Sequence, residues 1–210
     1  AAGATVAGLP ICVLAGYTLA RGRFFGSKLL YKSLIVTAAL PPVAYVIVIL
    51  RSAATLGLHD TNLVVLLWMM TQPLAILALR SYIRKLPQDM LDAARLEGLS
   101  DIGILRAIVL PHMKRGFITV AVLQFVVTWN ALTVPMVLVT SPEKQTLTVL
   151  AAQLARTPWL PWPQVTSAAL LSVLPVLVVF LLTHKLLLAE ASSWAEGRDW
   201  VEDPASDSTA

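Results

Sequence analysis

The stretch that decides the fold is residues 166–188, which read TSAALLSVLPVLVVFLLTHKLLL. These 23 residues contain one formally charged side chain, that of Lys185, close to their C-terminal end. A helix of about 20 mainly apolar residues can cross the hydrocarbon core of a bilayer. A lysine near its end can extend its ammonium group to the interface. The stretch therefore predicts a membrane-spanning helix.

Four further stretches have the same character, so the sequence predicts an all-α, polytopic membrane helix bundle with five visible spans. They are residues 4–20, 29–50, 63–79 and 116–140, and none contains an acidic residue. Each of the five contains proline, which kinks a helix and frees a carbonyl that needs another partner in lipid. The prolines are Pro10, Pro41, Pro42, Pro73, Pro135 and Pro175. Membrane helices also simply tolerate proline, but its presence in every stretch favours bent helices that line a pathway.

The composition of the whole chain excludes other classes of protein. Hydrophobic residues make up 57% of its 210 residues, charged residues make up 13%, and the mean hydropathy is +0.75. A soluble domain has about 25% charged residues, and a disordered chain is rich in charge and poor in apolar residues. The single cysteine, Cys12, excludes a disulfide framework and a multi-cysteine metal site.

Lysine and arginine predict the orientation, because they are enriched in cytoplasmic loops. Thirteen of the sixteen lie on one side of the predicted spans, and three lie on the other. This bias places the loop 80–115 and the C-terminus in the cytoplasm of a multi-pass protein of the cell (inner) membrane. The net charge of +4 thus follows the membrane topology, and we expect no nucleic acid partner. Since the sequence opens at Ala1 inside an apolar segment, we expect further residues to precede it.

The polar residues at membrane depth are few and carry no charge. Gln124 and Thr128 share one helical face, Trp129 and Asn130 lie beside it, and Gln72 precedes Pro73. Amides, hydroxyls and aromatic faces suit an uncharged polar solute such as a sugar, so these five residues are the candidate translocation path. The alternative is hydrogen bonding between helices, which we favour for any single one of them. On the first span, a stripe of small residues predicts a close packing seam: Ala4, Gly8, Cys12, Gly16 and Ala20.

Four of the six acidic residues before position 189 lie within 89–101, in the cytoplasmic loop 80–115. Pro87 suits the start of a first short helix, and Gly98 suits a left-handed C-terminal cap. Ser100 suits the N-cap of a second helix that Pro111 ends. Both helices have small apolar faces, which we expect to dock into the groove of a partner: Met90, Leu91 and Ala94, then Ile104, Leu105 and Ile108.

This loop resembles the EAA motif of permease subunits in binding-protein-dependent ABC importers. The matching residues are Asp92, Ala93, Ala94, Gly98, Ile108, Val109, Leu110 and Pro111, at the spacing of the motif. Further on, Trp129-Asn130, Pro135 and Gln145-Thr146-Leu147 look like the maltose-type carbohydrate branch. The resemblance covers about residues 16 to 188.

The resemblance implies a type I ABC importer permease fold in which the loop 80–115 carries coupling helices. Asp92 would make a polar contact with an ATP-binding subunit, Ala93 and Ala94 would allow close approach, and Gly98 would form the turn. Asp92 stands where Glu is usual, and Glu97 where Asp is frequent. Members of this branch commonly have six spans, so a first helix is expected to be missing from this chain.

The resemblance also implies partners. They are a second permease subunit, two ATP-binding subunits that bind ATP and Mg, and an external solute-binding protein or lipoprotein. This chain would hold no cofactor of its own and would not be an enzyme. An importer permease for a non-sugar solute, such as a polyamine or a phosphate ester, is the main alternative. A secondary transporter would need inverted repeats and usually an intramembrane charge, and the sequence shows neither.

Signals for catalysis are weak. Residues 22–28, GRFFGSK, miss the phosphate-loop spacing by one residue. The three histidines lie in separate regions, which argues against a metal site or a general base. We expect a transmembrane domain over residues 1–188 and an acidic cytoplasmic tail over 189–210, disordered or in contact with the ATP-binding subunit.

Overall fold

The computed structural model describes residues 1–22, 24–157, 159 and 161–195, and side chains to residue 188. Every regular element in this part of the chain is helical. The helices are α1 (Ala2–Arg21), α2 (Ser27–Ala39), α3 (Val46–Thr55), α4 (Asn62–Met70), α5 (Pro73–Arg84), α6 (Gln88–Leu96), α7 (Asp101–Ile104), α8 (Leu110–His112), α9 (Lys114–Trp129), α10 (Thr133–Leu138), α11 (Leu147–Arg156) and α12 (Trp162–Ala195). Single turns at Pro42–Ala44 (η1) and Pro142–Lys144 (η3) are 3₁₀, and Leu105–Val109 (η2) is a π-helix. Most of the predicted acidic tail, residues 196–210, lies outside the described residues.

Three segments are long and apolar enough to cross a membrane within the described residues. They are Ala2–Arg21, Asn62–Arg84, which comprises α4 and α5, and Trp162–Leu188 of α12. The predicted stretch 63–79 lies in the second of these segments and is itself broken at residues 71–72, and a continuous helix is also wrong for the other two stretches, 29–50 and 116–140. The first is interrupted at Leu40 and Pro41, and the second at residues 130–132, between α9 and α10. The count of five spans remains a prediction.

Proline explains where these helices break. Leu40 and Pro41 are extended, with ψ of 131° and 141°, because proline disfavours the helical conformation of the residue before it. The break between α9 and α10 includes residue 131, whose carbonyl would pair with the amide that Pro135 lacks. The break between α4 and α5 lies directly before Pro73. By contrast, Pro10 and Pro175 remain inside α1 and α12.

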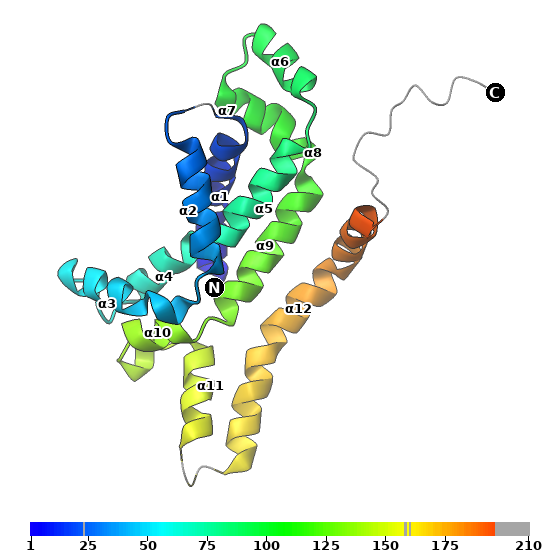
Figure 1. Cartoon of the computed structure of the whole chain (residues 1–210). Helices are drawn as coiled ribbons and strands as arrows, with labels where there is room; N and C mark the ends of the chain where they lie inside the picture. The colour runs from blue at the N-terminus through cyan, green and yellow to red at the C-terminus, as the bar shows by residue number, and fades with distance from the viewer. Residues whose placement is uncertain (23, 158, 160, 196–210) are drawn as a thin grey trace.

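The small-residue seam of α1 is confirmed as the centre of the bundle. Ala4 and Cys12 are 1% and 0% exposed, and Gly8 and Gly16 are buried. Helix α1 packs against α4, α5 and α9, as Figure 1 shows. Cys12 is a buried free thiol, as expected for a small apolar member of the seam. The seam therefore joins the two clusters of the core, since Cys12 belongs to one and Ala4 to the other.

The two ends of the bundle differ. Figure 1 shows α6 and α7 at one end and α10 and α11 at the other. One terminus of each of α1, α5 and α9 points to the α6 end. These termini carry Arg21, Arg84 and Lys114, so residues predicted to lie on one side of the membrane lie at one end of the bundle. Helix α2 buries none of its residues, and α12 leaves large apolar side chains exposed. Such faces suit lipid or another membrane helix.

Replacement of Gly8 by alanine tests the seam. A Cβ atom there would overlap the backbone carbonyl of Met70 and lie 2.8 Å from Gln124 Nε2. We expect Gly8→Ala to destabilise the protein by roughly 1–3 kcal/mol, because the clash is with backbone. Thermal unfolding in detergent measures the effect.

The matched control is Gly3→Ala on the same helix, where the added Cβ would lie 3.6 Å from Leu66 Cδ1, an ordinary contact. This variant should be neutral or slightly stabilised, because alanine is the better helix former. Equal unfolding midpoints for the two variants would contradict the close approach at Gly8.

Candidate functional site

The candidate site is the helical hairpin at the α6 end of the molecule. Helix α6 begins after Pro87, and Gly98 follows it with φ of 84°, a left-handed conformation that glycine adopts without steric cost. Ser100 then caps α7, accepting a hydrogen bond from the Gly103 amide at 3.2 Å. The two helices and the turn predicted from the sequence are therefore present.

The predicted role of the apolar faces is wrong, because they form part of the chain's own core. Leu91 is 0% exposed and Ala94 4%, and they pack in one cluster with Ile104, Ile83 and Val109. The exposed side of the hairpin instead presents polar residues and a few apolar ones, among which Leu96 is 91% exposed. These exposed residues include Asp92, Ala93, Arg95, Leu96, Glu97, Asp101 and Ile102.

Pro111 does not end the second helix as predicted. The helical path continues from α7 through the π-helix at Leu105–Val109 to His112, and Met113 separates it from α9. A proline clashes with the carbonyl of the residue four positions earlier, here Ala107. The wider π turn contains that residue and is a known means of accommodating such a defect.

A ring of polar contacts, completed by the backbone of α1 between Tyr17 and Arg21, connects this hairpin to α1. On the hairpin, Arg95 pairs with Asp92 at 2.9 Å and with Asp101 at 3.6 Å. Asp92 also accepts from Gln88 Nε2 at 3.0 Å. On α1, Tyr17 donates to Asp101 at 3.4 Å, and Arg21 donates to Gln88 Oε1 at 2.6 Å. The polar ring comprises Tyr17, Arg21, Gln88, Asp92, Arg95 and Asp101.

Arg21 makes the most extensive contacts of this ring. Besides Gln88, its guanidinium donates to the carbonyls of Ile83 at 2.8 Å and Leu86 at 2.5 Å, at the junction of α5 and α6. The ring residues line a cavity of about 780 Å³ beside the end of α1. One side chain of α1 therefore fixes the position at which α6 leaves the bundle.

Sequence reasoning identified Asp92 but missed Tyr17, Arg21, Gln88 and Arg95. The contacts of Arg21 and Tyr17 span 67 and 84 residues of sequence. The available signal was that Tyr17 and Arg21 lie one helical turn apart at the cytoplasmic end of the first span. That signal gave no indication of their partners.

The predicted path residues Gln72 and Gln124 each bond a backbone carbonyl beside the break between α4 and α5. Gln124 is 2% exposed, and its Nε2 donates to the Met70 carbonyl at 3.2 Å, near the Cys12 thiol. Gln72 Nε2 lies 3.5 Å from the carbonyl of Met69, the group that Pro73 leaves without a helical partner. Both side chains thus donate hydrogen bonds to backbone carbonyls at a helix break. Their contact with a solute remains a prediction.

The other three path residues lie at the end of α9. Thr128 is 2% exposed and bonds its own helix at Phe125, whereas Asn130 is exposed. The indole of Trp129 donates to the Ser172 carbonyl at 2.8 Å, three residues before Pro175. Trp129 therefore links α9 to the proline-containing part of α12.

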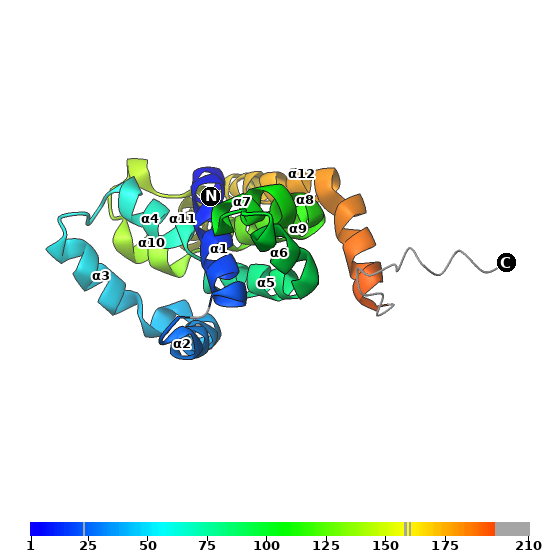
Figure 2. The ribbon, with the colours of Figure 1, turned by 90° about the horizontal axis from the view of Figure 1, so that it is seen from above.

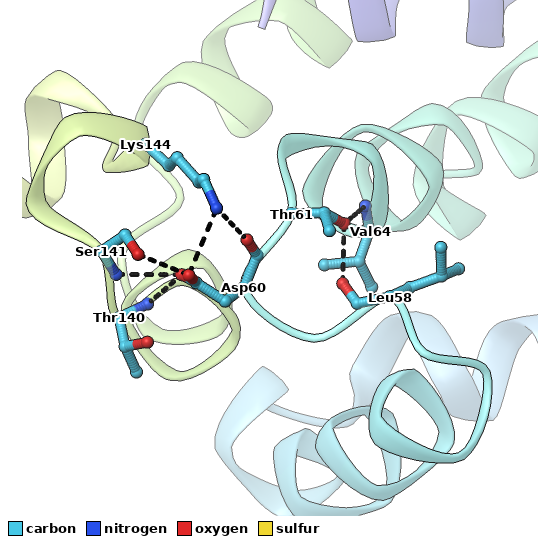
Figure 3. Close-up of polar contacts among 7 residues, drawn as sticks. All are labelled: Leu58, Asp60, Thr61, Val64, Thr140, Ser141 and Lys144. Atoms are coloured by element: carbon cyan, nitrogen blue, oxygen red, sulfur yellow. Dashed lines mark hydrogen bonds and ion pairs between the residues drawn. The ribbon is translucent and has the colours of Figure 1, made fainter.

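A third polar cluster, at the opposite end, was not predicted. Figure 3 shows Asp60, in the α3–α4 loop, facing Thr140, Ser141 and Lys144. Its Oδ1 accepts from the amides of Thr140 and Ser141, both at 2.9 Å, and its Oδ2 from the Ser141 hydroxyl. Lys144 Nζ lies 3.3 Å from Oδ2 and donates to the Asp60 carbonyl at 2.9 Å. The cluster clamps the α3–α4 loop to the segment after α10.

Both carboxylate oxygens of Asp60 accept hydrogen bonds, which stabilises the charged form of the side chain. Hydrogen bonds from the Ser141 hydroxyl and amide hold the pKa of Asp60 far below its usual range, with smaller contributions from Thr140 and Lys144. Its φ of 57° is the left-handed conformation that Asp and Asn tolerate better than most residues.

Comparison with known proteins identifies the class of this helix bundle. Residues 8–189 match the sequence model of the family described as binding-protein-dependent transport system inner membrane component. The chain belongs to this family. It is therefore an inner membrane, multi-pass permease component, a transport subunit rather than an enzyme, from a family without cofactors of its own.

Several curated proteins are similar along most of the chain. The inner membrane ABC transporter permease protein YcjP of Escherichia coli strain K12 is 29% identical, over 83% of this chain and 63% of that protein. The arabinooligosaccharides transport system permease protein AraQ of Bacillus subtilis strain 168 is 28% identical, over 88% and 66%. The chain thus spans less than two thirds of the length of these two relatives.

A solved structure shows the same fold. It is the crystal structure of a bacterial ABC transporter involved in the import of the acidic polysaccharide alginate. The match has a TM-score of 0.74 at 22% identity and covers 87% of this chain and 70% of the other. At that identity the likeness establishes the permease fold alone.

The polar cluster around Asp60 predicts a pH-dependent stability. Because the pKa of Asp60 is lower in the folded than in the unfolded chain, the carboxylate stabilises the fold at neutral pH. This contribution is lost as the pH falls below about 4, the ordinary Asp value, towards the folded pKa. We expect Asp60→Asn to lower the thermal midpoint by a few degrees at pH 7 and to have a smaller effect in acid.

Asparagine preserves the shape and the left-handed tolerance of Asp60, but it removes the charge and replaces one of the two acceptor oxygens by a donor. The pH dependence of the comparison therefore reports on the charge. The control is Glu143→Gln, an exposed carboxylate in the neighbouring turn η3, which should leave the midpoint unchanged. A deficit of Asp60→Asn that stays constant between pH 7 and pH 3 would contradict the role of the charge.

Proposed function

We propose that this chain is the transmembrane permease subunit of an ATP-driven importer for a sugar or sugar-like solute and forms half of its translocation pathway. The hairpin α6–α7 would receive the motion of an ATP-binding subunit. The single observation that carries the proposal is the family match over residues 8–189. The exposed Asp92–Ala93 face, on a hairpin fastened to the bundle, agrees with it.

Family membership supports the proposed partners, which are a second permease subunit, two ATP-binding subunits and an external solute-binding protein or lipoprotein. ATP and Mg would be bound by the ATP-binding subunits. The names of relatives support the solute class, since they include transport systems for arabinooligosaccharides and trehalose. A non-sugar solute is the second candidate, because a relative that is 32% identical is named for osmoprotective compounds.

The proposed mechanism follows from the attachment of the hairpin. Its apolar face is part of the core, so α6 cannot move freely on its own. Closure of the ATP-binding subunits would therefore displace α6 together with the ends of α5 and α1, through Arg21 and the polar ring. Each exposed ion pair of the ring contributes only about 0–1 kcal/mol to stability. We therefore assign the ring to positioning rather than to stability.

Charge reversal at Asp92 tests the coupling assignment. We expect Asp92→Lys to reduce ATP-driven uptake into vesicles by about tenfold or more, because the lysine would face Arg95 and the partner contact would be lost. The readouts are uptake and ATP hydrolysis by the whole transporter, each measured with the solute-binding protein present.

The control at the same position is Asp92→Glu, which keeps the charge and restores the residue usual in the motif, and it should retain uptake. Uptake by Asp92→Lys at the level of the unaltered transporter would refute the assignment. Binding measurements on the solute-binding protein would independently identify the solute.

Arg21→Lys tests whether α1 receives the motion. Lysine keeps the charge but cannot reach the three acceptors that the planar guanidinium bonds at once. We expect uptake per ATP hydrolysed to fall several-fold while the assembled complex is retained. The control is Arg84→Lys, an exposed arginine on the same side. If uptake and hydrolysis fell in parallel, Arg21 would have a structural role only.

A further inference from the structure

A second cavity, of about 370 Å³, lies between α2 and α5 beside the cytoplasmic end of α1. Lys28, Tyr31 and Lys32 of α2 line it on one side and Arg80 of α5 on the other. Lys28 and Lys32 are one helical turn apart, so they lie on one face of α2. Three cations from two helices thus converge on one hollow.

The charge in this hollow is unbalanced. None of the described residues that line it is acidic. Arg80 is fixed in place, since its Nε donates to the Leu19 carbonyl at 3.2 Å and its guanidinium lies 3.8 Å from the centre of the Tyr31 ring. Neither contact neutralises its charge, so the hollow attracts an anion.

The lining of the cavity also includes apolar residues. They are Leu19, which is buried, and Ile35, which is 43% exposed and lies about 10 Å further along α2 than Lys28 at 1.5 Å per residue. The adjoining surface of α2 is also apolar and open, with Leu29 73% and Val36 58% exposed. Figure 2 shows α2 at the margin of the bundle. A basic group of residues beside an apolar lining and an open apolar flank matches the headgroup and the acyl chains of a lipid.

We propose that this cavity binds an anionic phospholipid of the cytoplasmic leaflet. Lys28, Lys32 and Arg80 would hold the phosphate, with the Ser27 and Tyr31 hydroxyls as further donors. The acyl chains would lie past Ile35 along α2. Basic pockets between membrane helices on the cytoplasmic side bind lipid headgroups through this combination of charge and depth. The apolar residues of the lining and the open apolar flank of α2 favour a lipid over a soluble phosphate.

The test uses the full-length protein in a neutral detergent, titrated with short-chain phosphatidylglycerol and, separately, short-chain phosphatidylcholine. We expect phosphatidylglycerol to bind more tightly. Removal of both lysines in Lys28→Gln/Lys32→Gln should weaken its binding about 30-fold, at about fivefold for each charge near the surface. Lys28→Arg/Lys32→Arg should retain binding.

The matched control is Lys114→Gln/Arg115→Gln, which removes two exposed charges on the same side but outside the cavity, and should bind as the unaltered protein does. An equal loss in this control, or equal affinity for the two lipids, would overturn the proposal. Glycerol phosphate that competes as strongly as the lipid would overturn the assignment to a lipid. None of these outcomes depends on transport activity.

Discussion

Backbone carbonyls at the helix breaks and in the proline-containing helices are the constraint on which the rest of this structure depends, because the bilayer core offers no water to bind them. The chain supplies partners from distant segments. Gln124 and Cys12 reach the Met70 carbonyl at the end of α4, and Trp129 reaches the Ser172 carbonyl in α12, the helix that contains Pro175. These bonds join α9 to α4, α1 to α4 and α9 to α12. The polar residues at membrane depth thus hold bent helices together, and Gly8 is small because the Met70 carbonyl lies against it.

Charged side chains hold segments together at the two ends of the bundle, outside the apolar interior. On the outer side, one carboxylate, Asp60, accepts from two amides and a hydroxyl and pairs with Lys144. On the inner side, Arg21 fixes the departure of α6, and the polar ring continues from it to Asp101. The hairpin is therefore fastened to the bundle by packing and hydrogen bonds, as the proposed transmission of motion from an ATP-binding subunit requires.

Periodicity and composition predicted the helical class and the small-residue seam, because each depends on residues that are neighbours in sequence. The caps at Gly98 and Ser100 were predictable for the same reason. The breaks at residues 40–41 and 130–132 were not, although proline marked their vicinity, because tertiary contacts decide whether a proline bends or ends a helix. The same holds for Leu91 and Ala94, whose apolar face was assigned to a partner but packs inside. The ring contacts of Arg21 and Tyr17 join residues that are 67 and 84 positions apart in the sequence, so no local pattern indicated their partners.

The central claim is that the exposed face of α6, rather than its apolar face, meets the ATP-binding subunit. Cysteine cross-linking in the assembled transporter tests it most directly, with the buried Cys12 first replaced in Cys12→Ala. Ala93 is exposed, whereas Ala94 is 4% exposed. The account predicts that Ala93→Cys cross-links to the ATP-binding subunit and that Ala94→Cys does not. Cross-linking from Ala94→Cys alone would contradict it.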